Sequence, residues 1–187
     1  MTKREKTISI IVPIYNEEWS IRPLYGKLLR ALTNYNLREI IFVDDGSTDG
    51  TGKSLEELAS QEGIVRVIYF RRNFGLTQAL QAGIDYATGE YIVTISGNMQ
   101  HEPADIPKLL TLLDEGYDVS VGWPIANEGE LKRRKSRSLH NWVISKISGV
   151  TLHDYDCILR AYKKELLEGM QLYGNLERYI PIYVFWK

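Results

Sequence analysis

The chain has 187 residues, of which 44% are hydrophobic and 25% charged, and its formal net charge at pH 7 is −1. This length and composition indicate one soluble globular domain with a sizeable core and exclude a disordered chain. The net charge near zero argues against general nucleic-acid binding. No apolar run approaches the ~18 residues of a membrane-spanning helix. The chain has one cysteine, Cys157, and three histidines. A single cysteine cannot form an internal disulfide, which fits a reducing compartment. With so few cysteines and histidines, a Cys/His zinc site is not expected.

Strand-like and helix-like segments alternate up to Gly122. Short apolar runs rich in β-branched residues predict strands at residues 8–14, 39–43, 65–70, 91–95 and 119–121. Apolar residues at helical spacing predict helices between them, within residues 21–32, 55–59, 76–87 and 106–113. This alternation is typical of an α/β fold with a doubly wound, mostly parallel sheet covered on both faces.

Beyond Gly122 the alternation stops. Residues 123–130 show no periodicity and predict a loop, and residues 132–137 carry five basic residues around Ser136. Apolar spacing predicts an amphipathic helix within residues 139–147, and a strand is expected at 158–162. Residues 176–186 are apolar and aromatic.

The loops at the carboxyl ends of the strands are the places to look for a site, because ligands of doubly wound sheets bind there. After the first strand, Asn16 is a candidate helix N-cap with acidic residues behind it. After the second strand, Asp49 or Thr51 can cap a helix, while the acids before them can accept hydrogen bonds from a base or ribose. Neither Gly-x-Gly-x-x-Gly nor Gly-Lys-Ser/Thr occurs, so a Rossmann dinucleotide turn and a P-loop are absent.

Four segments at or near these loops carry a resemblance to a known family: Ile11-Val12-Pro13-Ile14-Tyr15-Asn16-Glu17, Val43-Asp44-Asp45-Gly46-Ser47-Thr48-Asp49-Gly50-Thr51, Arg72-Asn73-Phe74-Gly75 and Ala82-Gly83. Together they resemble the nucleotide-sugar half of the GT-A glycosyltransferases of the large inverting family 2. Three more narrow it to the polyprenyl-phosphate glycosyltransferases: Met99-Gln100-His101-Glu102-Pro103, Glu115-Gly116-Tyr117-Asp118-Val119 and Asp154-Tyr155-Asp156-Cys157-Ile158-Leu159-Arg160-Ala161-Tyr162. The resemblance covers essentially the whole chain.

The resemblance implies a role for each matching position on the donor side. The base and ribose of the nucleotide are expected to lie between Pro13, Tyr15 and Glu17. Asp44 is expected to accept a hydrogen bond from the base, and Asp45 lies beside it in the sequence. Arg72 is expected near the nucleotide or its diphosphate, and Gln100 near the diphosphate.

On the acceptor side, Lys132, Ser136 and Arg137 are expected to meet the lipid phosphate. Asp154 matches the proposed catalytic base, and Arg160 is expected near it at the acceptor phosphate. A lipid phosphate is largely ionised at neutral pH and needs little deprotonation, so the enzyme mainly orients it and stabilises the leaving diphosphate. The basic residues at 132–137 suit a phosphate at a membrane surface. Taken alone, these residues fit a solvated charged loop equally well.

The chain departs from the family where the fourth strand ends. The family has Asp-x-Asp there, and this chain has Ser96 and Asn98. Mg²⁺ or Mn²⁺, expected for the family, prefers carboxylate oxygens and neutralises the leaving group. Three explanations remain open: a non-catalytic relative that still binds nucleotide or lipid, cationic side chains in place of the metal, or a metal held weakly through Asn98, the diphosphate and water.

The acceptor side also departs. Pro124 and Asn127 stand where the family often has an Arg-x-x-Arg pair, and Asp156 stands where Gly is usual. Family members continue beyond the point that matches Lys187, so the second half of this domain is expected to be truncated.

The sequence thus predicts a single GT-A, Rossmann-like domain over residues 1–187, with a nucleotide-sugar half (1–122) and an acceptor-side half (123–187). The predicted function is inverting transfer of a hexosyl-type sugar from a nucleotide-diphosphate sugar to a polyprenyl-phosphate lipid in cell-envelope glycan synthesis. The protein is expected to be cytoplasmic and peripheral to the cytoplasmic face of a membrane, without a nucleic-acid partner. The alternatives are a glycosyltransferase-like protein that binds nucleotide or lipid without turnover, and a transferase with a polysaccharide or protein acceptor.

Overall fold

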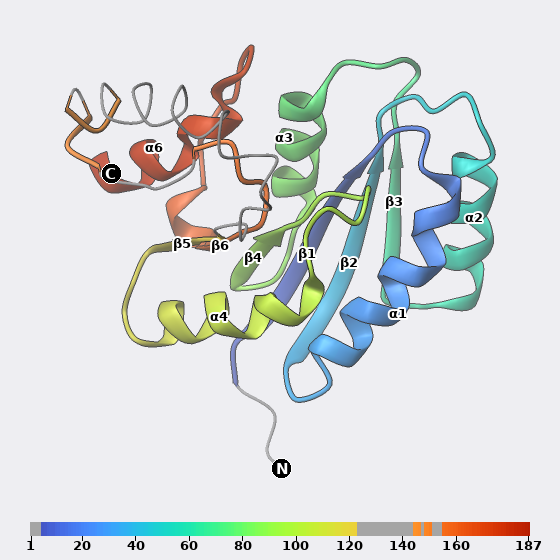
Figure 1. Cartoon of the computed structure of the whole chain (residues 1–187), viewed down its shortest axis with the longest axis horizontal. Coiled ribbons are helices and arrows are strands. Elements are labelled where there is room, and N and C mark those ends of the chain that lie inside the picture. The colour runs from blue at the N-terminus through green and yellow to red at the C-terminus, as the bar shows by residue number, and fades with distance from the viewer. Residues whose placement is uncertain (1–4, 123–143, 147, 151–154) are drawn as a thin grey trace, which may run out of the picture.

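The structure is a computed structural model that describes residues 5–122, 144–146, 148–150 and 155–187. A six-stranded sheet with the order β3-β2-β1-β4-β6-β5 runs through the molecule, with β3 at one side and β5 at the other (Figure 1). Its strands are β1 (Thr7–Ile14), β2 (Asn36–Asp44), β3 (Val65–Tyr69), β4 (Tyr91–Thr94), β5 (Val119–Val121) and β6 (Arg160–Lys163). The first four strands pair in parallel, whereas β6 is antiparallel to both β4 and β5.

Helices connect the strands and cover the sheet. The α-helices are α1 (Ile21–Ala31), α2 (Thr51–Gln61), α3 (Leu76–Tyr86), α4 (Ile106–Asp114) and α6 (Ile180–Trp186). Short 3₁₀ turns are η1 (Glu18–Ser20), η2 (Pro103–Asp105), η4 (Lys164–Leu166) and η5 (Leu176–Tyr179). Within the described ranges, no helix combines the length and the apolarity needed to cross a bilayer.

The side chains of the central strands alternate between two cores. Ile10 and Val12 of β1 pack in one core with α1, α2 and α4, whereas Ile11 packs in the other with α3 and the C-terminal segment. This period of two is the pleat of a strand buried on both faces. The continuous apolar runs of the sequence therefore produce two cores, as the prediction of a covered, mostly parallel sheet requires.

The path of the chain explains why α3 lies on the opposite face from α1 and α2. The chain moves outward from β1 to β2 and β3, and then returns past β1 to form β4. Crossovers of one hand place their helix on the other face when the direction of travel reverses. The carboxyl ends of β1 and β4 therefore lie at the switch point of the strand order, where ligands of doubly wound sheets bind.

The predicted strand at residues 119–121 is β5, and β6 lies between it and β4. One expectation from the sequence needs correction. Asn16 is not a helix cap: its backbone φ is 54°, its side-chain oxygen accepts from the Thr48 amide, and the first helical turn begins only at Glu18. The predicted helix within residues 139–147 lies mostly outside the described residues.

Candidate functional site

The crevice at the carboxyl ends of β1 and β4 holds a cavity of about 180 Å³. Its walls come from the loop after β1, the loop after β2, the first turns of α3 and the turn after β4. The lining residues are Pro13, Ile14, Tyr15, Glu17, Asp45, Leu76, Ala79, Ser96 and Asn98. Segments that are far apart in the sequence therefore meet at the edge where the strand order predicts a ligand.

The two acids at the end of β2 are both buried and have different partners. Asp45 accepts hydrogen bonds from the Phe74 amide (2.7 Å) on one carboxylate oxygen and from the Gly75 amide (2.9 Å) on the other. Asp44 uses one oxygen to accept from the Ser47 amide (2.9 Å). Asp45 thus fixes the loop that leads into α3, while the second oxygen of Asp44 has no hydrogen-bond donor among the described residues.

Gly46 lets the loop after β2, which carries Asp45, approach the loop after β3. Its φ is +72°, and an added Cβ would lie 2.4 Å from the carbonyl carbon of Arg72 and 2.8 Å from the amide nitrogen of Asn73. Only glycine meets both requirements, a left-handed conformation and backbone-to-backbone contact. Asp45 and Gly46 together therefore set the position of the Arg72–Phe74 segment relative to the crevice.

The loop after β1 is tied to the loop after β2 by three hydrogen bonds. The Asn16 amide donates to the Ser47 hydroxyl (2.9 Å), the Thr48 amide donates to the Asn16 side chain (2.8 Å), and the Glu17 amide donates to the Thr51 hydroxyl (2.9 Å). The Asp49 carboxylate accepts a hydrogen bond from the Thr51 amide (2.9 Å). The N-cap of α2 is Gly50, without a side-chain cap hydrogen bond, so neither Asp49 nor Thr51 is the predicted helix cap. These bonds hold Tyr15 and Glu17 over the edge of the sheet.

Arg72 lies over the ring of Phe74, with its guanidinium carbon 4.8 Å from the ring centre. Phe74 in turn meets Phe70 edge-on, with ring centres 5.6 Å apart. Half of the Phe74 side chain is exposed. Arg72 is thereby held next to the loop after β2, although it does not line the cavity itself.

The turn after β4 closes on itself. The Ser96 hydroxyl donates to the Asn98 side-chain oxygen (2.8 Å), and the Gln100 amide donates to the same oxygen (3.2 Å). Ser96 is buried, and Met99, between Asn98 and Gln100, has a φ of 57°. Neutral oxygens that are already hydrogen-bonded do not fit Mg²⁺ or Mn²⁺, which favour carboxylates, and the described residues contain no group of three or more metal-binding side chains.

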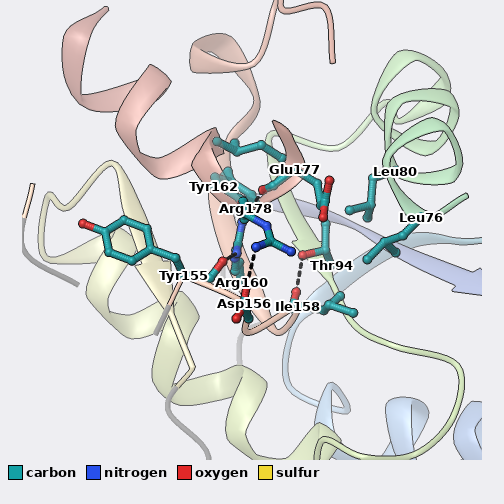
Figure 2. A pocket seen from close by; sticks show the side chains of 11 residues that line it. Leu76, Leu80, Thr94, Tyr155, Asp156, Ile158, Arg160, Tyr162, Glu177 and Arg178 are labelled. Atoms are coloured by element: carbon teal, nitrogen blue, oxygen red, sulfur yellow. Dashed lines mark hydrogen bonds and ion pairs between the residues drawn. The ribbon is translucent and has the colours of Figure 1, made fainter. Parts of the chain in front are cut away.

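A second cavity, of about 220 Å³, adjoins the first at Leu76 and reaches toward β6. Figure 2 shows Arg160 and Arg178 in the middle of this pocket, with Leu76 and Leu80 of α3 to one side. Arg178 forms an ion pair with Asp156 (3.3 Å) across it. The pocket therefore combines a partly exposed cation with an apolar wall.

Arg160, expected at the acceptor phosphate, lies buried and donates to main-chain carbonyls of the C-terminal part of the chain. Its Nε donates to Cys157 O, and its two terminal nitrogens donate to Glu177 O and Tyr155 O, each at 2.6 Å. The Tyr162 hydroxyl lies 3.4 Å from the same guanidinium, and burial raises the pKa of Tyr162 although Arg160 opposes the shift. In this arrangement Arg160 holds three separate main-chain carbonyls together through one guanidinium group.

The C-terminal segment closes this side of the site by contacts with α3. Thr77 hydrogen-bonds to Gly174 O (2.5 Å) and to the Glu177 carboxylate, and the Gln81 side chain pairs with the main chain of Met170 and Leu172. Sequence analysis missed Thr77, Glu177 and Arg178, because no local pattern joins segments about a hundred residues apart. The apolar face of the predicted helix 76–87 was the one signal that pointed to Leu76 and Ala79.

Apart from Arg160, which lines the second cavity, the predicted site residues fall into three groups. The crevice itself brings together Pro13, Tyr15, Glu17, Asp45 and Asn98. Around it, but not lining it, lie Asp44, Arg72 and the exposed Gln100. Lys132, Ser136, Arg137 and Asp154 lie outside the described residues.

Comparison with known proteins agrees with this architecture. Residues 9–170 match the family model of glycosyl transferase family 2. The chain is 41% identical over 181 residues to dodecaprenyl-phosphate galacturonate synthase of Rhizobium johnstonii, covering 95% of this chain and 54% of that protein. It is 35% identical to undecaprenyl-phosphate 4-deoxy-4-formamido-L-arabinose transferase of Proteus mirabilis, covering 94% and 54%. The chain therefore spans about half the length of these curated relatives.

Solved structures share the fold at lower identity. Glucosyl-3-phosphoglycerate synthase of Mycobacterium tuberculosis, solved with Mn²⁺, UDP and phosphoglyceric acid, superposes with a TM-score of 0.75 at 21% identity, covering 97% of this chain and 64% of that one. A mannosyltransferase of Pyrobaculum calidifontis, solved with GDP-Man and Mn²⁺, gives a TM-score of 0.62 at 22% identity, covering 88% and 46%. The predicted GT-A fold and the resemblance to polyprenyl-phosphate sugar transferases are confirmed.

Proposed function

The chain belongs to glycosyl transferase family 2, and from that premise we propose that it transfers a sugar, with inversion, from a nucleotide-diphosphate sugar to a polyprenyl phosphate. The observation that carries the proposal is the crevice at the switch point between β1 and β4, lined by Tyr15, Glu17 and Asp45. The names of two relatives, a dodecaprenyl-phosphate galacturonate synthase and an undecaprenyl-phosphate transferase, support the lipid acceptor.

The donor nucleotide would occupy this crevice. Pro13, Tyr15 and Glu17 would frame the base and ribose, and the second oxygen of Asp44 would accept a hydrogen bond from the base. Asp45 would act through the Phe74–Gly75 backbone, which its carboxylate already holds. Arg72 and Gln100 would stabilise charge on the diphosphate as it leaves.

The acceptor phosphate would approach from the β6 side, where the second cavity adjoins the first. Lys132, Ser136 and Arg137 would bind the phosphate, and Asp154 would orient it or accept a proton; Arg160 would hold the surrounding backbone. An ionised phosphate oxygen attacks the anomeric carbon of the sugar, and the bond from that carbon to the diphosphate oxygen breaks. The products are the polyprenyl-phosphate sugar and the nucleoside diphosphate.

A phosphate on a polyprenyl chain is presented at a bilayer surface. The five basic residues at 132–137 would draw the protein to anionic headgroups there. We accordingly place the reaction at the cytoplasmic face of a membrane, with the protein bound peripherally, in the synthesis of cell-envelope glycans.

The test is a transfer assay with polyprenyl phosphate in detergent micelles and a panel of UDP- and GDP-linked sugars, followed by mass spectrometry of the lipid product. We expect one donor to give a polyprenyl-phosphate sugar, and the Asp44→Ala variant to reduce its formation at least tenfold. Nucleotide binding without any lipid product would favour the non-catalytic binding protein instead. The absence of both binding and product would contradict both functions.

A further inference from the structure

We propose that this chain binds the nucleoside diphosphate without a divalent metal ion, because the turn after β4 is closed by its own hydrogen bonds. The inference rests on the proposed nucleotide-binding function and concerns how the same crevice accepts its ligand. It follows from the donor set of the turn and of the crevice around it.

The Asn98 side-chain oxygen is fully engaged. An amide oxygen has two lone pairs, and here one accepts from the Ser96 hydroxyl and the other from the Gln100 amide. A metal ion at this position would have to displace one of these donors. Displacing the Gln100 amide would also remove the support of Met99, a non-glycine residue in the left-handed region.

The carboxylates nearby do not compensate. Each oxygen of Asp45 already accepts a hydrogen bond from a main-chain amide, which fixes the carboxylate toward the loop that leads into α3 and leaves one lone pair on each oxygen. Among the described residues, Glu17 is the only other carboxylate that lines the crevice. Mg²⁺ and Mn²⁺ bind through several oxygen ligands, usually with carboxylates among them, and this crevice does not offer such a set.

Electrostatics also favour an ion-free turn. Two carboxylates at neighbouring positions repel each other and are stabilised by a cation between them. Ser96 and Asn98 attract each other as donor and acceptor, at 2.8 Å, and carry no charge that a cation would neutralise. This turn therefore reaches its folded geometry without an ion.

The test measures binding and metal occupancy separately in the 187-residue chain. Isothermal titration calorimetry with UDP and with GDP is performed in EDTA and in Mn²⁺, and Mn²⁺ binding to the protein is followed by electron paramagnetic resonance. We expect the dissociation constant of the nucleotide that binds to differ less than twofold between the two conditions. We also expect the protein to leave the Mn²⁺ spectrum unchanged.

A double variant, Ser96→Asp with Asn98→Asp, should create the missing metal site. We expect it to immobilise Mn²⁺ and to bind nucleotide at least tenfold more tightly in Mn²⁺ than in EDTA. The matched control is Ser60→Asp with Asn34→Asp, which adds the same two charges at exposed positions near the amino edge of the sheet. If the buried Ser96→Asp change prevents folding, as judged by circular dichroism, Asn98→Asp alone serves the same purpose.

The outcomes separate the two proposals. Wild-type binding that weakens tenfold or more in EDTA overturns metal independence and leaves the proposed function standing. Binding of neither nucleotide in either condition overturns both. Equal binding in the two conditions, with no lipid product in the transfer assay, supports metal independence and contradicts the transferase function.

Discussion

At the scale of single residues, buried carboxylates at the two ends of β2 have opposite uses. Asp45 follows the carboxyl end and holds the loop beside the crevice. Glu39 lies near the amino end, where its side chain accepts from the Ser9 hydroxyl and from the amide and hydroxyl of Thr88 and pairs with Arg66 at 3.0 Å. Asp45 therefore fixes a loop beside the crevice, whereas Glu39 links neighbouring strands near their amino ends.

Replacing Asp45 by Asn should weaken both the loop and nucleotide binding. An amide has one oxygen, so one of the Phe74 and Gly75 amides would lose its acceptor, and a donor left without a partner costs about 1–3 kcal/mol. We expect the free energy of unfolding in urea to fall by that amount and nucleotide affinity to fall at least tenfold. Asp49→Asn, at an exposed position, is the control, and equal effects of the two substitutions would contradict the role of Asp45.

Replacing Glu39 by Gln should change how stability depends on pH. Burial opposes ionisation of Glu39, but hydrogen bonds from Thr88 and Ser9 and the Arg66 guanidinium outweigh it and lower the pKa of the carboxyl. Its stabilisation is therefore present above the unfolded-state pKa of about 4.3 and is lost as the pH falls through the lower folded-state value.

We expect Glu39→Gln to lower the free energy of unfolding by about 1–3 kcal/mol at pH 7, with the difference from wild type shrinking below about pH 4.3. Urea unfolding across this range measures it. Glu90→Gln, which alters an exposed ion pair with Lys6 at the same edge, should have a much smaller effect. A difference for Glu39→Gln that stays constant with pH would contradict the assignment.

At the scale of elements, the distance between α3 and the sheet is set by one glycine. An added Cβ at Gly83 would lie 2.3 Å from Cγ2 of Ile11, in the middle of β1. The helix therefore packs directly against the central strand, and its first residues, Leu76 and Ala79, reach the crevice. Close packing in this element positions one wall of the site.

Gly83→Ala should push α3 away from β1. Overpacking of this kind costs about 1–3 kcal/mol, even though alanine has the better helix propensity. Gly63→Ala is the control, because nothing lies within 4 Å of its added Cβ. Thermal unfolding measures both, and Ile11→Ala combined with Gly83→Ala should recover part of the loss in a double-mutant cycle.

At the scale of the whole molecule, the C-terminal part is joined to the sheet by Arg160. Its guanidinium links β6 to the main chain of Tyr155, Cys157 and Glu177, and Glu177 in turn contacts α3 through Thr77. The buried cation thus connects the antiparallel strand, the second cavity and the 3₁₀ turn η5 in one network.

Arg160→Met should leave these carbonyls without a donor and lower the free energy of unfolding by about 3 kcal/mol or more. We expect hydrogen exchange to accelerate first in residues 155–187, while β1 and β2 stay protected. Arg22→Met, at an exposed pair with Glu57, is the control. Uniform acceleration across the sheet would show that Arg160 supports the entire fold instead of this part.

The sequence by itself determined the elements of the nucleotide half. The apolar runs of β1 and β2 and the helical spacing of α1 and α3 are local patterns, and local patterns depend on neighbours a few residues apart. The strand-end position of Asp44, Asp45 and Asn98 followed from the same patterns, because parallel strands place their carboxyl ends at one edge.

Only the tertiary structure decided how distant segments meet. The insertion of β6 between β4 and β5 depends on pairing over about seventy residues with β4 and about forty with β5, for which no periodicity exists. The internal bonds of Arg160 and the closed Ser96–Asn98 turn are also settled by three-dimensional packing, since a buried donor takes whichever acceptors the fold brings within reach. Residue type therefore pointed to the strand ends that line the crevice, and geometry decided which side chains there already have partners within the protein.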